Sequence, residues 1–378
     1  MASPPQFVED LIYLILESDD HWWPRDLLRL ARVSAAWLAP VRERLYACPS
    51  LRSFRACGLL ARTLTESPFL QSLLHGVDIH PLIGFDVDDG GLSAMEMTSL
   101  RFILSLDGLR SLKLGGELAI QAEIFLHSLV HSDVVTELHT DGSAQGAERS
   151  HFCCRRRPSL KWDEVMAFKF PNLRKLQLSN LDIDILWPPM PYNLEVTDLH
   201  INNVNITSGY IPHLFHGSWS SLRHLSVIAR TATDFDEHLR LALGCCGPGL
   251  EDLHYEVADA RSNCGLFDDA DSLVLPSLRR LFLCGVDVQP HTLSVIQEVC
   301  RNLEVLSITG RVVRVSPQDW ASFLRSNALP ALRYLNTPWG TYHPPFVRWS
   351  QESAKSVLDA SVIRNIHLSR PLTSSSQC

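Results

Sequence analysis

The chain has 378 residues, of which 46% are hydrophobic and 20% are charged, a composition typical of a soluble protein with a sizeable core. Its 34 Lys and Arg residues against 42 Asp and Glu residues give a net charge of −8. Nucleic-acid-binding proteins usually present a basic face, so this balance argues against a nucleic-acid partner. The length exceeds one ordinary compact domain, although a repeat solenoid can run this far without splitting.

The ten cysteines and the first residues of the chain bear on its compartment. The pairs Cys153-Cys154 and Cys245-Cys246 are adjacent, which strains a mutual disulfide, and no Cys-x-x-Cys is present. Reduced, buried thiols of an intracellular protein are the better interpretation. The longest apolar run near the N-terminus, from Leu11 to Leu16, has six residues and no basic segment before it. We therefore expect no signal peptide, no membrane span and a cytoplasmic or nuclear location.

The first fifty residues have the hydrophobic spacing of short helices. The run from Phe7 to Leu16 predicts one helix, and residues 26–33 predict a second. Ser34 can cap a third helix, which Pro40 should interrupt before residues 41–46 resume it. Three short helices cannot bury all of this apolar surface among themselves. Part of it is therefore expected to face another protein.

The order of these features resembles an F-box. The family pattern is a Pro near the start, an apolar helix, Asp-Leu-Leu, then Val-Ser and a Trp three residues later. This chain has Pro4 and Pro5, Phe7 to Leu16, Asp26-Leu27-Leu28, Val33-Ser34 and Trp37. It departs at the opening, where Ser3 and Gln6 stand in place of the usual Leu and Glu.

The F-box resemblance implies that residues 1–50 form a helical domain that binds a Skp-type adaptor and, through it, a cullin–RING ubiquitin ligase. The residues that it assigns to adaptor binding are Pro4, Pro5, Phe7, Leu11, Ile12, Ile15, Leu27, Leu28, Val33 and Trp37. The alternative is that these helices only cap the repeats that follow them.

A three-beat pattern of apolar residues recurs through the rest of the chain. In Leu173, Leu176 and Leu178 the second residue follows the first by three positions, and the third follows by two more. Because side chains alternate along a strand, the last two beats face one side of it. The same spacing recurs at Leu109/Leu112/Leu114, Val196/Leu199/Ile201, Leu222/Leu225/Val227, Leu250/Leu253/Tyr255, Leu278/Leu281/Leu283 and Leu303/Leu306/Ile308, with weaker copies at Leu74/Val77/Ile79, Leu332/Leu335 and Ile363/Ile366/Leu368.

The middle beats from Leu176 to Leu306 are 23 to 28 residues apart, a period typical of leucine-rich repeats. The chain resembles that family over about residues 70–370, and an F-box before such repeats is a common family arrangement. Many family members place Asn or Cys three residues after the last beat. Here Leu181, Val204 and Val286 occupy that position, so we expect a less regular curvature.

Segments with helical spacing separate the predicted strands, at residues 118–129, 234–243 and 292–300 and from Ser316 onward. The predicted fold class is α/β, an N-terminal three-helix F-box followed by an irregular leucine-rich repeat solenoid with a curved parallel sheet. The predicted boundaries are a helical domain at 1–50, a connector at 51–69, the solenoid at 70–368 and a disordered tail at 369–378.

The residues between the repeated leucines are predicted to line the concave face of the solenoid. Aromatic and Arg side chains there would serve as anchors for a protein partner. The residues assigned to target binding are Lys113, His139, Gln177, His200, His224, His254, Arg280, Phe282 and Tyr334. The alternative is that solvent simply covers a polar sheet face.

Neither a metal site nor a catalytic site is indicated by the motifs. His200, His224 and His254 fall on three successive predicted strands, and neighbouring strands lie ~4.8 Å apart, but no closer set of zinc ligands accompanies them. The sequence contains no Gly-x-Ser-x-Gly, no phosphate loop, no His-Glu-x-x-His and no Gly-x-Gly-x-x-Gly. We therefore expect a non-enzymatic protein without a cofactor or metal.

The two resemblances together imply the substrate-recognition subunit of an SCF-type (Skp–cullin–F-box) E3 ubiquitin ligase. Its helices would bind the adaptor, and its repeats would hold a target protein near the conjugating enzyme, contributing proximity rather than bond chemistry. One alternative is a ligase-independent leucine-rich repeat scaffold. The other is an enzyme whose site is assembled on the concave face, which would need a deep pocket with paired titratable groups.

Overall fold

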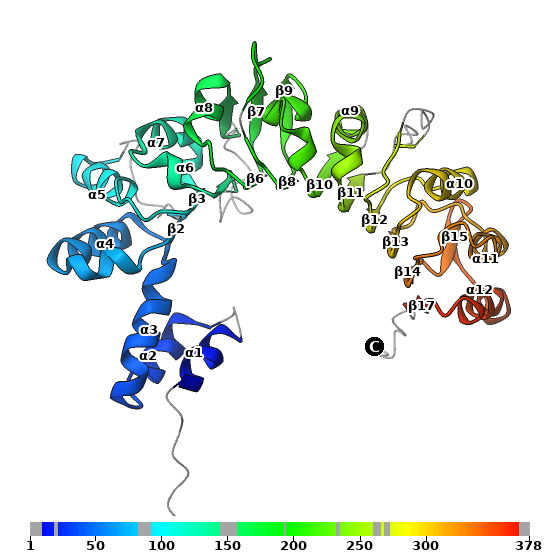
Figure 1. Ribbon diagram of the computed structural model, residues 1–378, viewed down its shortest axis with the longest axis horizontal. Coiled ribbons are helices and arrows are strands. Elements are labelled where there is room, and N and C mark those ends of the chain that lie inside the picture. Colours follow the sequence, from blue (N-terminus) through cyan, green and yellow to red (C-terminus); the bar gives the residue numbers. More distant parts are fainter. Residues whose placement is uncertain are drawn as a thin grey trace, which may run out of the picture. The chain divides into compact units, whose positions relative to one another are not determined.

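The computed structural model describes residues 10–18, 22–81, 92–143, 157–192, 194–231, 235–259, 266–267 and 273–369. The chain divides into two compact units, Met1–Arg156 and Arg157–Cys378, called unit 1 and unit 2 below. The predicted tail therefore lies outside the described residues from residue 370 onward. In each unit parallel strands alternate with helices, as Figure 1 shows.

Unit 1 begins with three helices that share a small core. They are α1 (Asp10–Glu17), α2 (Pro24–Leu30) and α3 (Ala35–Ala47). Ile12, Leu16, Leu27 and Val41 are buried together at their centre. The predicted interruption at Pro40 is wrong, because α3 runs through this buried proline. Trp37 and Leu45 pack against the same core on either side of Pro40, and this packing holds the helix together.

The rest of unit 1 consists of repeats. Its elements are β1 (Ser50–Leu51), α4 (Phe54–Glu66), η1 (Pro68–Leu73), β2 (Gly76–Ile79), α5 (Ala94–Leu104), β3 (Ser111–Gly115), α6 (Glu117–Ile120), α7 (Ala122–Ser128), η2 (Ser132–Val134) and β4 (Glu137–Asp141). The strands β1, β2, β3 and β4 are parallel and pair in that order. Residues 51–69, predicted as a connector, contain helix α4 and the start of η1. The single helix predicted at residues 118–129 is two short helices, separated at Gln121.

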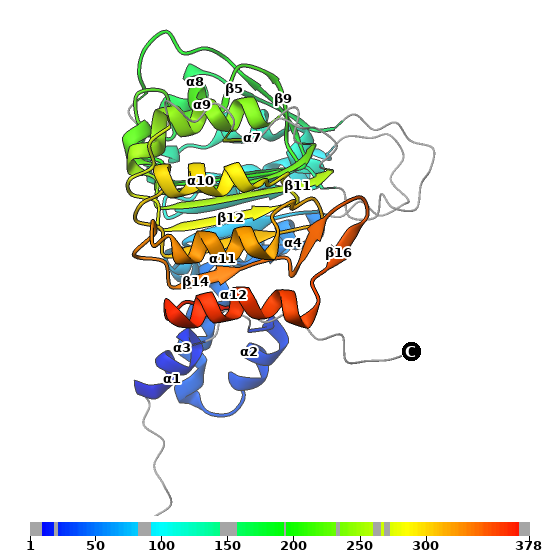
Figure 2. The same cartoon turned by 90° about the vertical axis from the view of Figure 1, so that its right-hand side faces the viewer.

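Unit 2 contains one long parallel sheet, with strands in the order β6, β8, β10, β11, β12, β13, β14 and β17. These strands span Lys175–Ser179, Asp198–Asn202, His224–Thr231, Asp252–Asp259, Arg280–Cys284, Val305–Thr309, Tyr334–Asn336 and His367–Leu368. The helices α9 (Asp236–Cys246), α10 (Pro290–Val299), α11 (Pro317–Arg325) and α12 (Gln351–Ile363) cover one face of the sheet, and Figure 2 shows them side by side. Two short antiparallel strands, β15 (Gly340–Tyr342) and β16 (Phe346–Arg348), lie outside it.

The predicted leucine beats pair in register across the sheet of unit 2. Leu176 pairs with Leu199, Leu199 with Leu225, and the series continues through Leu253, Leu281, Leu306 and Leu335, all buried. The last step differs from the prediction, because Leu368 rather than Ile366 pairs with Leu335. The mixed α/β fold with a long parallel sheet is therefore confirmed.

A residue with left-handed backbone conformation ends several of the strands, two positions after the last beat. Gly116, Asn180, Asn203, Gly285 and Gly310 have φ values of 59°, 54°, 50°, 71° and 108°. At three of these positions the backbone N–H continues the ladder of hydrogen bonds between strands. Asn180, Asn203 and Gly285 donate to the carbonyls of Asn202, Ile228 and Thr309, at 2.9, 2.7 and 3.1 Å. The next position along, three residues after the last beat, holds the buried Leu181, Val204 and Val286 in place of Asn or Cys. Gly and Asn are the residues that adopt this conformation most readily.

In the first part of unit 2, the outer layer contains a second sheet. Strands β5 (Ser159–Trp162), β7 (Asp182–Ile185) and β9 (Asn205–Ser208) form this parallel sheet, beside α8 (Glu164–Lys169) and the 3-10 segments η4 (Ile211–Phe215), η5 (Trp219–Ser221) and η6 (Gly247–Gly249). Sequence analysis missed β7 and β9, although Asp182-Ile183-Asp184-Ile185 alternates with the period of a strand. Trp162 is fully buried here, and its indole N–H donates to the Leu214 carbonyl at 3.0 Å.

The six described cysteines carry free thiols. Burial raises the pKa of Cys57 to about 11 and that of Cys300 to about 12, so both thiols are protonated at neutral pH. In the described part of the chain, every helix is too short or too polar to cross a membrane.

Candidate partner-binding surfaces

The first candidate surface lies on helices α1 to α3, where the adaptor-binding residues were predicted. Leu11, Leu28 and Val33 are exposed as that role requires, and Ile15 and Trp37 are partly exposed. Ile12 and Leu27 are instead 1% and 4% exposed within the shared core. They support the surface from beneath and cannot form it. Pro4, Pro5 and Phe7 lie outside the described residues.

The exposed apolar surface of these helices is larger than the predicted set. Leu14, Trp23 and Leu38 are all exposed, Leu14 by 60% and Trp23 by 66%. Helical spacing could have identified Leu14, because it follows Leu11 by three positions on the same face. The two adjacent tryptophans lie in different surroundings. Trp22 packs on the core, and Trp23 faces outward.

The second candidate surface is the face of the unit 2 sheet that carries no helix, called the open sheet face below. Register places its side chains in two rows that cross the strands. The first row is Lys175, Asp198, His224, Asp252, Arg280, Val305, Tyr334 and His367, and the second is Gln177, His200, Ser226, His254, Phe282, Ser307 and Asn336. All of the predicted target-binding residues of unit 2 belong to these two rows.

Acidic and basic side chains alternate along the first row from Lys175 to Arg280. The Asp252 carboxylate accepts hydrogen bonds from both Nε and Nη2 of Arg280, and its Oδ2 lies 2.8 Å from Nδ1 of His224. The residues that directly precede the strands also form ion pairs. Arg223 and Glu251 are 3.7 Å apart, and Arg279 and Glu304 are 3.4 Å apart. Exposed pairs of this kind contribute little stability.

Aromatic side chains occupy the part of the open sheet face nearer β17. The Tyr334 ring is 53% exposed and lies 5.2 Å from the His367 ring, and Phe282 lies 6.0 Å from His254. Rings are strong anchors in protein interfaces because they bury much area at little conformational cost. This half of the face therefore has the stronger anchoring groups.

The three predicted histidines of unit 2 do not converge. His200 and His254 lie in the second row with Ser226 between them, about 9–10 Å apart by strand spacing, and His224 lies in the other row. Among the residues that the structure describes, no group of three or more His, Cys, Asp or Glu side chains could hold a metal ion.

Burial chiefly lowers the pKa of His200, and the Lys175 ammonium lowers it further. The folded chain therefore binds a proton at this imidazole less readily than the unfolded chain, so stability is retained above the unfolded pKa and is lost as pH falls below it. We expect the thermal unfolding midpoint of the wild type to fall when the pH is lowered from 7.5 to 5.5. The midpoint of His200→Gln should fall less. The exposed His343→Gln is the control. An equal decrease in His200→Gln and the wild type would contradict this assignment.

Lys113 and His139 lie on adjacent strands of unit 1, beside Asp78 in register. The Arg52 guanidinium lies 2.9 Å from the Asp78 carboxylate, so this row is also partly neutralised. Burial chiefly lowers the pKa of His139. These two predicted residues thus occupy a polar sheet row within unit 1 and belong to a different unit from the other predicted residues.

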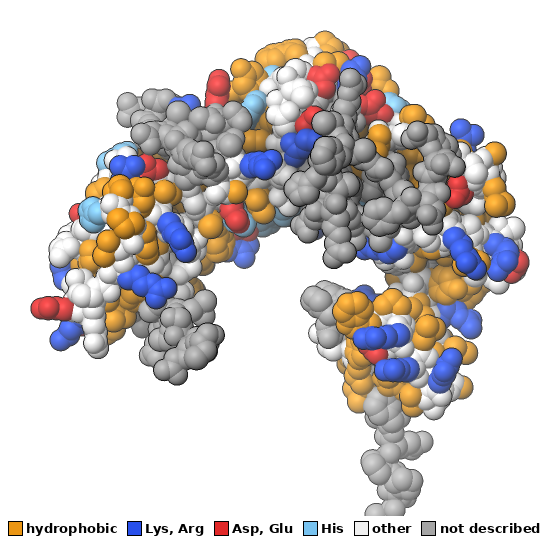
Figure 3. All heavy atoms as spheres, turned by 180° about the vertical axis from the view of Figure 1, so that it is seen from behind, with side chains coloured by type: hydrophobic (Ala, Val, Ile, Leu, Met, Phe, Trp, Pro, Cys, Tyr) orange, Lys and Arg blue, Asp and Glu red, His pale blue; other side chains and the backbone are white. Residues whose placement is uncertain are grey.

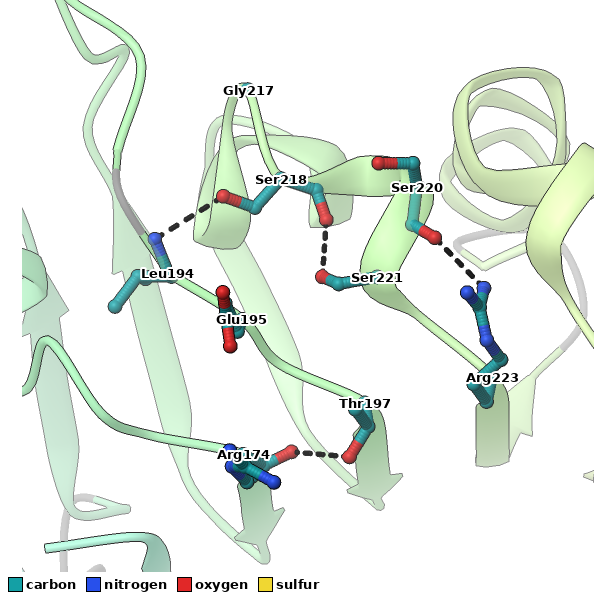
Figure 4. Close-up of a pocket in the computed structure, with 9 residues that line it drawn as sticks. All are labelled: Arg174, Leu194, Glu195, Thr197, Gly217, Ser218, Ser220, Ser221 and Arg223. Carbon is teal, nitrogen blue, oxygen red and sulfur yellow. Dashed lines mark hydrogen bonds between the residues drawn. The ribbon is translucent and has the colours of Figure 1, made fainter.

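An open pocket of about 390 Å³ lies in unit 2 where the chain enters β6, β8 and β10 (Figure 4). The Nη1 group of Arg223 donates to the carbonyls of Ser220 and Gly249, at 2.8 and 2.9 Å. The Ser218 and Ser221 hydroxyls likewise donate to backbone carbonyls. Arg174 and Glu195 complete the polar lining. These groups hold the strand-entry loops together, which is the structural role that the geometry assigns to them.

The in-register strands and the repeating turns give the chain a leucine-rich repeat, solenoid-like architecture within each unit. No protein-family model matches the sequence, and no curated protein is detectably similar to it. Among solved structures, the chain is similar to an internalin from Listeria monocytogenes, with 10% sequence identity and a TM-score of 0.36. That match covers 95% of this chain and 93% of the internalin chain.

Proposed function

We propose that this chain is the substrate-recognition subunit of an SCF-type ubiquitin ligase. Helices α1 to α3 bind a Skp-type adaptor, and the open sheet face binds the target protein. The observation that carries the proposal is the exposed apolar surface of α1 to α3, which remains after their small shared core has formed. The F-box-like order of residues in the same segment supports it.

Energetics support a bound partner on these helices. Fully burying a large apolar side chain contributes about 1.5–3 kcal/mol. Leu14, Trp23, Leu28 and Val33 are each exposed by more than half, so covering what remains of them supplies about 2.5 times that amount. Two of the predicted residues, Ile12 and Leu27, hold the helices in register beneath this surface.

On the target side, the open sheet face supports recognition by shape and ring contacts. Asp252 is already paired with Arg280 on this face, and Tyr334 and Phe282 project from it. A protein segment laid across the strands would bury these rings against several repeats at once. The chain contributes position and orientation, and the conjugating enzyme of the ligase performs the bond chemistry.

The adaptor arm is tested with the double variant Leu11→Asp/Leu14→Asp in the full chain. Both residues are exposed, so the charges leave the helical core intact and place two desolvation penalties in the interface. We expect co-elution with a purified Skp-type adaptor to be lost, with at least a hundredfold weaker binding. The matched control is Val362→Asp/Ile363→Asp on α12, whose residues are 76% and 78% exposed.

Adaptor binding should survive in the α12 control, and circular dichroism should show both variants folded. Undiminished binding by the Leu11/Leu14 variant would remove these helices from the interface. Failure of the wild-type chain to bind the adaptor would reject the ligase assignment and favour the ligase-independent scaffold.

A further inference from the structure

Seven rings form a continuous strip in unit 2, on the side of the long sheet opposite the open sheet face. The ring strip consists of Phe235, His238, Tyr210, His213, Trp187, His216 and Trp219. Adjacent ring centroids are 4.3 to 6.2 Å apart, the closest being those of Trp187 and His213. These distances are those of contacting aromatic pairs.

The ring strip is exposed at Trp187 and Tyr210, whereas Phe235 at one end of it is 5% exposed. Trp187 is 70% exposed and Tyr210 is 38% exposed, while His213 is buried beneath them both. Val165 and Phe168 on α8, and Met190 three residues after Trp187, are further exposed apolar side chains. The ring strip lies where the second sheet and η4 form the outer layer. Figure 3 shows hydrophobic side chains gathered over that part of unit 2. An exposed apolar area of this kind commonly marks an interaction site.

Backbone hydrogen bonds hold the rings in place. The Tyr210 N–H donates to Nδ1 of His213 at 3.2 Å, and the Trp219 indole N–H donates to the Pro212 carbonyl at 2.9 Å. The Tyr192 N–H donates to the His216 carbonyl at 2.6 Å and fixes the loop that carries Trp187. A surface fixed in this way loses little conformational entropy when a partner binds.

Two carboxylates belong to the elements beside the ring strip, Glu237 on α9 and Glu164 on α8. Glu237 is exposed and directly precedes His238. On the α8 side, Phe168 contacts Tyr192, and burial together with the Glu164 and Asp163 carboxylates raises the pKa of Tyr192 to about 12. Asp163 is paired with Lys161, whereas neither Glu164 nor Glu237 forms an ion pair with any described residue. Two acidic groups without an ion pair to a described residue thus accompany the aromatic surface.

We propose that the ring strip is an interaction surface for a protein segment that carries Lys or Arg among apolar residues. The exposed face of Trp187 attracts a cation, most strongly where water is excluded. Glu164 and Glu237 attract the same charge, and Met190 and Phe168 cover the apolar side chains of the partner. This surface is separate from the open sheet face and does not depend on the proposed ligase function.

The test measures fluorescence anisotropy of labelled 16-residue peptides on the full chain. One peptide alternates Lys with Leu and Ala, a second replaces each Lys by Glu, and a third replaces it by Gln. We expect the Lys peptide to bind at least tenfold more tightly than the Glu peptide. Trp187→Phe should weaken its binding slightly, and Trp187→Leu, which removes the ring face but keeps apolar bulk, should weaken it about fivefold.

Two controls separate a site from general attraction to an acidic chain. Glu164→Gln/Glu237→Gln should weaken Lys-peptide binding and reduce its salt dependence, whereas Asp107→Asn/Glu352→Gln, with the same change in net charge at exposed positions elsewhere, should not. Tyr334→Ala on the open sheet face should also leave the affinity for the Lys peptide unchanged. Equal binding of the three peptides, or equal loss in the two charge variants, would overturn the proposal.

Discussion

Trp162→Ala should destabilise unit 2 by about 3–5 kcal/mol, the usual cost of removing a fully buried Trp. The ring is 0% exposed inside the outer layer, and its N–H reaches the Leu214 carbonyl across 52 residues of chain. Removing the indole leaves a cavity and an unsatisfied Leu214 carbonyl. Strand β5 and segment η4 then lose the hydrogen bond that joins them.

The measurement for Trp162→Ala is calorimetric or denaturant unfolding, with hydrogen exchange to assign the loss to unit 2. Trp187→Ala is the matched control, because the same side chain is removed from a site that is 70% exposed. We expect that control to change stability by less than about 1 kcal/mol. Similar losses in both variants would show that burial of Trp162 does not hold the outer layer together.

Gly285→Ala should destabilise the chain by about 2–4 kcal/mol, for a reason unrelated to the core. Gly285 has φ of 71°, a conformation that Ala adopts at a cost, and a Cβ there would collide with the Val257 carbonyl oxygen. The collision is with backbone, so β11 or the turn after β12 must move.

The matched control for this substitution is Gly244→Ala, within helix α9. A Cβ at Gly244 meets no atom within 4 Å, and Ala is the better helix former by about 0.5–1 kcal/mol. The same chemical change should therefore destabilise at one position and stabilise at the other, as measured by urea unfolding. Neutral behaviour of Gly285→Ala would mean that the turn relaxes without cost.

The surfaces of the molecule divide between helices and sheet faces. The exposed apolar residues of α1 to α3 suit a partner helix, whereas Tyr334 and Phe282 suit a segment laid across strands. The ring strip adds a third chemistry, with imidazole and indole rings in contact with one another. Each surface has a variant that removes it without touching the others, so their partners can be separated experimentally.

The repeats were predictable because their signal is local and recurs. Each of the beats Leu176, Leu199 and Leu225 is buried in the expected strand, since alternation along a strand decides which side chains face the core. The start of the helix at Ser316 was predictable because its signal is also local. The Ser316 hydroxyl accepts a hydrogen bond from the Asp319 N–H within a single turn. What the amino-acid sequence determined by itself was this repeating frame and the identity of the residues between the beats.

Only the tertiary structure decided which apolar residues remain exposed. Ile12 and Leu14 are equally apolar and two residues apart, yet one is buried and the other is exposed, because Leu27 and Val41 approach α1 from one side. The ring strip joins Trp187 to Phe235 through contacts far apart in sequence, and β7 pairs with β5 and β9 across loops. Such contacts depend on long-range packing, which no local spacing of residues encodes.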